Sequence, residues 1–233
     1  MTPPADATQP SPPPTPRLVE LSHVVEAGMV TYPGLPGPEL AVHLSREASR
    51  EVYASGTEFE IGRITMVANT GTYLDTPLHR FAAGADLADV PLEKVAALSG
   101  VMLDLRGAGR RGIDPSMLEN LDVAGRAVLL QTGWSVHWRT DQYAVEAPFL
   151  GAGGAQWLVD RGAVLVGIDS INIDDMADRS RPAHTTLLGA GIPVLEHLTG
   201  LDALPGNGFT LHAAPVRVRG MGTFPVRAYA VLG

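Results

Sequence analysis

The chain has 233 residues, of which 45% are apolar, and a formal net charge of −8 at pH 7. The acidic balance argues against a surface for nucleic acid or any other polyanion. Because the chain has no cysteine, disulfides, thiolate metal sites and a cysteine nucleophile are excluded, and any metal must be held by Asp, Glu and His.

The first sixteen residues are rich in proline, threonine and alanine, which predicts a disordered tail over 1–16. No polar linker interrupts residues 17–233, so we expect one domain there. The start lacks the charged and apolar segments of a signal peptide, and no later apolar run reaches the roughly 18 to 20 residues of a membrane span. We therefore expect a soluble, cytoplasmic protein with no membrane partner.

Short apolar or β-branched runs alternate along the chain with segments of helical composition. The runs predict buried strands at residues 61–68, 101–105, 127–131, 163–168 and 229–232. Helices are predicted over 91–98 and 153–161, and a short one over 194–198 after a proline. The alternation indicates the α/β class.

Residues 69–80, Asn-Thr-Gly-Thr-Tyr-Leu-Asp-Thr-Pro-Leu-His-Arg, concentrate polar groups in a segment broken by Gly and Pro. A proline lies between Asp75 and His79, which predicts a strand running into a turn rather than a regular helix. Alternate residues of a strand share a face, and positions 69, 71, 73 and 75 are in phase, so Asn69 and Tyr73 should face the same cavity as His79. Taken alone, the segment fits a hydrogen-bonded turn without chemistry equally well, because Asp, Thr, Gly and Pro are common turn residues.

The same segment resembles the signature of the cyclase family that contains bacterial kynurenine formamidase and isatin hydrolase, usually His-x-Gly-Thr-His-x-Asp-x-Pro-x-His. The matching residues are Gly71, Thr72, Asp75, Pro77 and His79. Asn69 and Tyr73 stand where that pattern has two metal-binding histidines.

The resemblance covers residues 17–233 in the family's order. Further segments that carry it are Ser22-His23, Thr31-Tyr-Pro-Gly34, the strand ending in Thr-Gly-Trp134, Gly167-Ile-Asp-Ser170, the stretch from His184 to Leu201, Ala214-Pro-Val-Arg-Val-Arg-Gly220 and the closing run from Pro225. It implies a swivelling β/β/α domain with a mixed sheet and the site at its strand ends. It also implies a homo-oligomer that acts on a small-molecule substrate.

In the dinuclear members of the family, one metal is held by a His and a Glu that match His184 and Glu196, together with the motif Asp. Carried over to this chain, Asp75, His184 and Glu196 form a site for one divalent metal, of the kind that suits Zn, Mn or Fe. The second family site has lost its imidazoles at Asn69 and Tyr73, so two metals are not expected.

The resemblance also suggests roles for the other motif residues. His79 would be the general base or proton shuttle, as the last motif His is in the relatives. Tyr73 could donate to a developing oxyanion, and Asn69 could contact the substrate through its amide.

Each candidate also has a structural interpretation. Asp75 could form a plain turn, Glu196 could be solvated on a short amphipathic helix, and His184 or His79 could brace a turn. The remaining histidines, except His23 in its family-like segment, are interpreted as structural; these are His43, His137, His197 and His212. The acidic stretch 169–178 lacks the glycine and the closing Glu of a calcium loop, which favours a solvated or substrate-facing loop.

Three functions stay open on the sequence. The first is a metal-dependent hydrolase of a small-molecule amide C–N bond, a formamide or lactam, similar to arylformamidase. The second is a non-hydrolytic cyclase or dehydratase of a small carbonyl compound, in which metal is optional. The third is an inactive relative that binds a small ligand. Metal dependence separates the first two, and a site filled by apolar contacts would favour the third.

Overall fold

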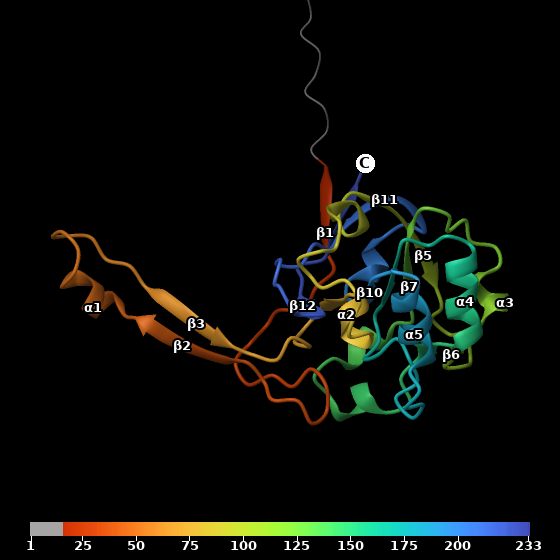
Figure 1. Cartoon of the computed structure of the whole chain (residues 1–233), viewed down its shortest axis with the longest axis horizontal. Helices are drawn as coiled ribbons and strands as arrows, with labels where there is room; N and C mark the ends of the chain where they lie inside the picture. The colour runs from red at the N-terminus through yellow and green to blue at the C-terminus, as the bar shows by residue number, and fades with distance from the viewer. Residues whose placement is uncertain (1–15) are drawn as a thin grey trace, which may run out of the picture.

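A nine-stranded mixed sheet organises the computed structural model, which describes residues 16–233 (Figure 1). Across the sheet the strands follow in the order β1 (Arg17–Glu20), β13 (Tyr229–Leu232), β11 (Asn207–His212), β5 (Leu98–Asp104), β7 (Ala127–Gln131), β9 (Leu165–Ile168), β10 (Val194–Glu196), β4 (Tyr73–Asp75) and β12 (Thr223–Pro225). The four central strands from β5 to β10 are parallel, and the remaining pairs are antiparallel. The expected α/β class with a mixed sheet is confirmed.

Both faces of β7, β9 and β10 are buried, as continuous apolar runs predict, and β5 is buried in part. Within β7, Val128 and Leu130 pack into the apolar cluster that includes Leu158 and Leu187 of the helices α4 (Ala152–Asp160) and α5 (Pro182–Gly189). Leu129 points the other way, into a second cluster beneath the antiparallel strands. The shorter elements are α2 (Pro77–Arg80), α3 (Pro115–Leu118), the small pair β6 (Gly112–Ile113) and β8 (Phe149–Leu150), and single 3-10 turns at Leu92–Lys94, Trp134–His137, Asp141–Ala144 and Leu201–Ala203.

One predicted strand is correct in type and wrong in place. Residues 61–68 contain β3 (Ile61–Thr65), but this strand is exposed along its length and pairs only with β2 (Glu39–Leu44), in a two-stranded sheet apart from the main one. With the short helix α1 (Arg46–Arg50), the pair forms an arm that projects from the body of the molecule (Figure 1). A short apolar run shows strand propensity but does not say which surface covers it.

Two helix predictions also need correction. Residues 194–198 begin with β10, because Val194–Glu196 is held between β9 and β4 in the sheet, and tertiary pairing outweighs a short local pattern. Of residues 91–98, only Leu92–Lys94 form a 3-10 turn, and β5 already begins at Leu98. The helix predicted over 153–161 is confirmed as α4.

The predicted tail, residues 1–16, lies outside the described residues except for Pro16. The single domain over 17–233 stays a prediction. Within residues 16–233, no helix is long and apolar enough to cross a membrane.

Candidate active site

The pairing of three strands brings four polar side chains to one face of the sheet. In the antiparallel pairs, Tyr73 lies opposite Glu196 and Asp75 lies opposite Thr223. Residues directly opposite each other in such pairs share a face, and so do residues two apart in one strand. Tyr73, Asp75, Glu196 and Thr223 therefore converge although they are far apart in the chain.

Two histidines approach this face from short helices. Pro77 occupies the first turn of α2, where its missing N–H costs nothing, so the expected turn after Asp75 is a single helical turn that carries His79. Gly222 allows this turn to sit close, since a Cβ there would lie 2.3 Å from the backbone nitrogen of His79. His184 comes from the first turn of α5.

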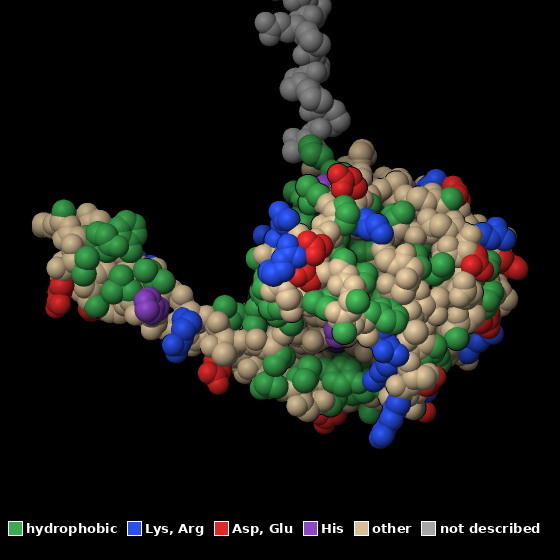
Figure 2. Space-filling model, in the orientation of Figure 1, with side chains coloured by type: hydrophobic (Ala, Val, Ile, Leu, Met, Phe, Trp, Pro, Cys, Tyr) green, Lys and Arg blue, Asp and Glu red, His purple; other side chains and the backbone are tan. Residues whose placement is uncertain are grey.

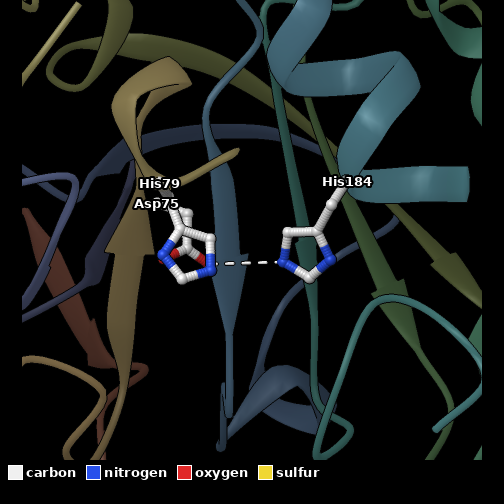
Figure 3. A group of neighbouring side chains, drawn as sticks. All are labelled: Asp75, His79 and His184. Carbon is white, nitrogen blue, oxygen red and sulfur yellow. Dashed lines mark ion pairs between the residues drawn. The ribbon is translucent and has the colours of Figure 1, made fainter. Parts of the chain in front are cut away.

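Two of the three pairs among the expected metal ligands lie within ligand distance, His184 with Asp75 and His184 with Glu196. The Nε2 atom of His184 is 3.5 Å from Oδ2 of Asp75 and 3.6 Å from Oε1 of Glu196, and all three side chains are buried. His79 also takes part, with Nδ1 3.5 Å from Oδ1 of Asp75 (Figure 3). Asp75, His79 and His184 each offer a ligand atom within 4.8 Å of the others, so two possible ligand sets share Asp75 and His184.

The residues present fit a divalent metal. Oδ2 of Asp75 and Nε2 of His184 are buried and have no hydrogen-bond partner among residues 16–233, and their separation of 3.5 Å is too long for a good hydrogen bond. Two ligand atoms bound to one tetrahedral metal at about 2 Å each lie roughly 3.3 Å apart. The unsatisfied pair is therefore spaced as two ligands of one ion would be.

The charge around His184 supports the same conclusion. Its Nδ1 donates to Oδ2 of Asp174 at 2.6 Å, which directs Nε2 toward the other two carboxylates. Burial alone would lower the pKa of the imidazole, but the charge of Glu196 and the interactions with Asp174 and Asp75 raise that pKa to about 10. Three buried carboxylates around one imidazole leave excess negative charge, which a dication would balance.

We predict that Asp174→Asn weakens metal binding by about 10- to 100-fold, because a carboxylate behind a metal-bound histidine orients the ring and raises its basicity. In the described part of the chain, Asp174 is the only carboxylate hydrogen-bonded to Nδ1 of His184, and it also accepts from the backbone nitrogen of Ala183. Competition titration with a chromogenic chelator measures the affinity. Asp175→Asn, a change on the same loop, is the control and should bind metal normally; equal affinities in the two variants would contradict the prediction.

Glu196 is held by a chain of hydrogen bonds running behind the site. Its Oε2 accepts from the hydroxyl of Tyr73 at 2.6 Å, and Oε1 accepts from the backbone nitrogen of Ile173 at 2.5 Å. Nε2 of His197 lies 3.2 Å from the same hydroxyl oxygen, and Nδ1 lies 3.0 Å from the hydroxyl of Tyr143. With Glu196 ionised, Tyr73 donates to it, so His197 donates from Nε2 and accepts from Tyr143.

The pKa values of His197 and Tyr73 agree with these hydrogen bonds. Burial lowers the pKa of His197 to about 3, so the ring is neutral. Burial, with the charges of Glu196 and Asp75, raises the pKa of Tyr73 well above its usual value, so the phenol keeps its proton. The hydroxyl of Tyr73 is thus directed at Glu196, and its role as an oxyanion donor stays a prediction.

His79 is oriented through Thr223. The hydroxyl of Thr223 contacts both Oδ1 of Asp75 and, at 2.8 Å, Nδ1 of His79. Because a carboxylate only accepts and a hydroxyl has one proton, Thr223 donates to Asp75 and accepts from Nδ1–H. The lone pair of His79 is then on Nε2, which leaves that atom able to take a proton.

The site opens into a pocket of about 280 Å³. Asn69, Tyr73 and His79 line it, so the expectation that they face one cavity is met, together with Arg80 and Arg181. The extended strand is shorter than expected, since β4 covers only Tyr73–Asp75. Asn69 reaches the pocket through a bend at Gly71, whose φ of +66° favours glycine.

Several site residues escape the sequence analysis. Thr223 and Tyr143 carry no motif, and the interpretation of His197 as structural fits its burial but not its place behind Glu196. The expectation of a solvated acidic stretch is wrong for Asp174 and Asp169, because both are buried. Asp169 accepts hydrogen bonds from the backbone nitrogens of Thr132 and Gly133. An acidic run in sequence does not show which carboxylates turn inward to bind helix or strand ends.

The comparison with known proteins agrees with the fold and with the family resemblance. The Cyclase family model, described as "Putative cyclase", matches residues 19–175. Kynurenine formamidase from Bacillus cereus is 26% identical over 216 residues, which are 92% of this chain and 97% of that protein. Kynurenine formamidase from Erythrobacter litoralis is 26% identical over 204 residues, 87% of this chain and 88% of that protein.

Solved structures show the same architecture. A potential metal-dependent hydrolase with cyclase activity superposes with a TM-score of 0.77 and 25% identity, over 93% of this chain and 98% of that chain. Isatin hydrolase A from Ralstonia solanacearum superposes with a TM-score of 0.79 and 21% identity, over 94% of this chain and 92% of that chain, a likeness of fold. With its family model matched over most of its length, this chain belongs to the Cyclase family.

Proposed function

We propose that this protein is a metal-dependent hydrolase that cleaves the amide C–N bond of a small molecule, a formamide or lactam, in the manner of an arylformamidase. The observation that supports it most strongly is the unsatisfied pair formed by Oδ2 of Asp75 and Nε2 of His184, buried beside the carboxylates of Glu196 and Asp174. The related kynurenine formamidases and isatin hydrolase support the choice of an amide bond.

In this proposal Asp75, His184 and Glu196 hold one divalent ion, Zn, Mn or Fe. Such an ion polarises a carbonyl and makes bound water more acidic. Asp75 and Glu196 supply two negative charges, and Asp174 and Tyr73 hold His184 and Glu196 in place through the hydrogen bonds described above.

The other pocket residues would handle substrate and protons. His79 accepts the proton of the attacking water at Nε2 and returns it to the leaving nitrogen. Throughout, its Nδ1–H donates a hydrogen bond to the hydroxyl of Thr223. Asn69 lines the same pocket and contacts the substrate through its amide. A volume of about 280 Å³ suits a substrate of one or two rings, at the small end of the range for ligand sites. We further propose that the protein works in the cytoplasm as a homo-oligomer.

The proposal is tested by purifying the protein without added metal or chelating resin and measuring bound metals by mass spectrometry. We expect close to one divalent ion per chain, and hydrolysis of an aryl formamide or an isatin-type lactam that stops after chelation and returns with metal. Turnover of a carbonyl substrate without metal would support the cyclase or dehydratase instead. Ligand binding with neither metal nor turnover would support the inactive relative.

A further inference from the structure

The reaction proposed above builds up negative charge on the carbonyl oxygen of the substrate. The oxygen of water attacks the carbonyl carbon, the π electrons of the carbonyl move onto its oxygen, and His79 takes one water proton at Nε2. The C–N bond then breaks as the carbonyl re-forms, and the same proton passes to the leaving nitrogen. Between these steps, the oxyanion is stabilised by hydrogen-bond donors that are held in place before the reaction.

Two polar side chains beside the expected metal ligands have no proton to give to this oxyanion. The hydroxyl of Tyr73 donates its only proton to Oε2 of Glu196 at 2.6 Å. His79 donates from Nδ1 to Thr223 and keeps Nε2 free to accept the proton of water. The donor for the oxyanion therefore lies elsewhere in the pocket.

The two arginines of the pocket are attached to its outer parts. Nε of Arg80 donates to the hydroxyl of Thr185, and Arg80 is exposed. Arg181 donates from Nη1 to the backbone oxygen of Asp175 and from Nη2 to the hydroxyl of Tyr32. In the space-filling view a histidine is recessed in the middle of the body, and basic side chains lie on the surface beside it (Figure 2). Neither arginine is buried, so their charges suit the solvent side of the pocket.

Asn172 has a side-chain amide whose orientation is fixed. Its Oδ1 accepts from the backbone nitrogen of Asp174 at 2.9 Å, and because a backbone N–H needs an acceptor, the amide nitrogen Nδ2 points the other way. Asn172 is only 8% exposed and lines the same pocket as His184 and Glu196. Among residues 16–233, Nδ2 donates to no other residue and is not sealed off, so it is a donor open to the pocket.

The other amide of the pocket, Asn69, is directed at Tyr73. Burial raises the pKa of Tyr73, and a hydrogen bond from Asn69 opposes that rise. Asn69 is also only half-buried, whereas Asn172 is buried. Of the two amides, Asn172 is therefore the one with a free donor in a fixed position.

The loop of residues 169–174, which follows β9, is held rigidly. All of its residues are buried. The hydroxyl of Ser170 donates to the backbone oxygen of Pro148 at 2.7 Å. The backbone nitrogen of Ile173 donates to Oε1 of Glu196 at 2.5 Å, which places the loop directly against a proposed metal ligand. A donor fixed in this way needs no reorganisation when charge develops, and such preorganised donors are the effective ones.

We propose that Asn172 is a catalytic residue, whose Nδ2–H donates to the oxygen of the substrate carbonyl as that oxygen becomes an oxyanion. This role rests on the proposed amide hydrolysis. The neutral, planar carbonyl accepts the same hydrogen bond more weakly, so the interaction stabilises the transition state more than the bound substrate. Asn172 thereby acts on the rate of the reaction more than on substrate binding.

Two substitutions separate this role from a purely structural one. Asn172→Asp keeps an oxygen to accept from the backbone nitrogen of Asp174 but replaces the donor with an acceptor. Asn172→Ala removes the acceptor and the donor together. Asn120→Ala, at an exposed position, is the control.

The full chain of each variant is compared with the unchanged protein in three measurements. These are steady-state hydrolysis of an aryl formamide, metal content, and affinity for N-phenyl methylphosphonamidate, whose tetrahedral phosphorus carries an anionic oxygen. Circular dichroism checks that each variant is folded. If Asn172→Ala does not fold, the affinity for the phosphonamidate relative to KM in Asn172→Asp decides between the two roles.

We expect Asn172→Ala to lower kcat by about 10²- to 10³-fold, the usual effect of removing one oxyanion donor, and to change KM little. Asn172→Asp should lower kcat at least as much, because a carboxylate repels the oxyanion. In both variants, the affinity for the phosphonamidate should fall by the same factor as kcat/KM, as it does for a transition-state analogue. Neither variant should lose metal, and Asn120→Ala should match the unchanged protein.

Several results would overturn this role. Normal turnover in Asn172→Asp with slow turnover in Asn172→Ala would show that only the acceptor matters. Normal turnover in Asn172→Ala, or a loss of metal in parallel with the loss of rate, would also rule the role out. In each of these cases the unchanged protein still hydrolyses the formamide, so the proposed function stands. An unchanged protein that hydrolyses no amide overturns both.

Discussion

Glu196→Gln is expected to abolish amide hydrolysis and to lower metal affinity by at least about 10- to 100-fold. The glutamine keeps the shape of the side chain but removes one of two negative charges available to offset a dication. It also replaces one acceptor oxygen with an amide nitrogen, which is a donor. Both oxygens of Glu196 accept hydrogen bonds, one from Tyr73 and one from Ile173. One of those buried donors would lose its partner.

The pKa of Glu196 sharpens this expectation. Burial raises that pKa to about 7, and the charge of Asp75 adds to the shift while His184 and Tyr73 oppose it. A buried carboxylate that is costly to ionise alone is stabilised by a cation, so metal and ionised Glu196 support each other.

The effect is measured by comparing the metal content and the steady-state hydrolysis rate of the unchanged protein with those of Glu196→Gln, prepared in parallel. Glu119→Gln removes the same charge at an exposed position and should leave both quantities unchanged. Full metal occupancy together with normal turnover in Glu196→Gln would mean that the ion, or the reaction, does not need this carboxylate. The metal site proposed above would then be wrong.

His79→Ala is expected to keep the metal and to lose turnover by about 10²- to 10⁴-fold, the usual contribution of a general base. The reason is the orientation of the ring, since Nδ1–H is engaged by Thr223 and Nε2 is left to take a proton. Asp75, His184 and Glu196 remain to hold the ion.

The same substitution separates the two ligand sets. Because Asp75, His79 and His184 also lie within 4.8 Å of one another, His79 could be a ligand instead of a base. In that case His79→Ala would lose metal and activity together, and excess metal would restore part of the rate. Thr223→Val is the companion variant: it keeps the imidazole, removes its hydrogen-bond acceptor, and should lower kcat less than His79→Ala.

Much of the framework could be predicted from local pattern. The apolar runs at 101–105, 127–131 and 163–168 correspond to the parallel strands β5, β7 and β9, of which β7 and β9 are buried throughout, because strands covered on both faces read as continuous apolar segments. The motif around Asp75 and His79 pointed to a site, and family resemblance joined it to His184 and Glu196. Composition excluded thiolate chemistry through the absence of cysteine.

Only the tertiary structure decided how these groups act together. Thr223 meets Asp75 across 148 positions of chain, and Tyr73 meets Glu196 across 123, because β4 pairs with β12 and β10. In the sequence, Asp174 is one acid in an acidic run. In the fold, the start of α5 places His184 within hydrogen-bond distance of it. Residues 61–65 read as core until their pairing with β2 places them on an exposed arm. Local sequence reports propensity and periodicity, whereas the choice of strand partners, and with it which polar groups are buried together, is a property of the whole packed chain.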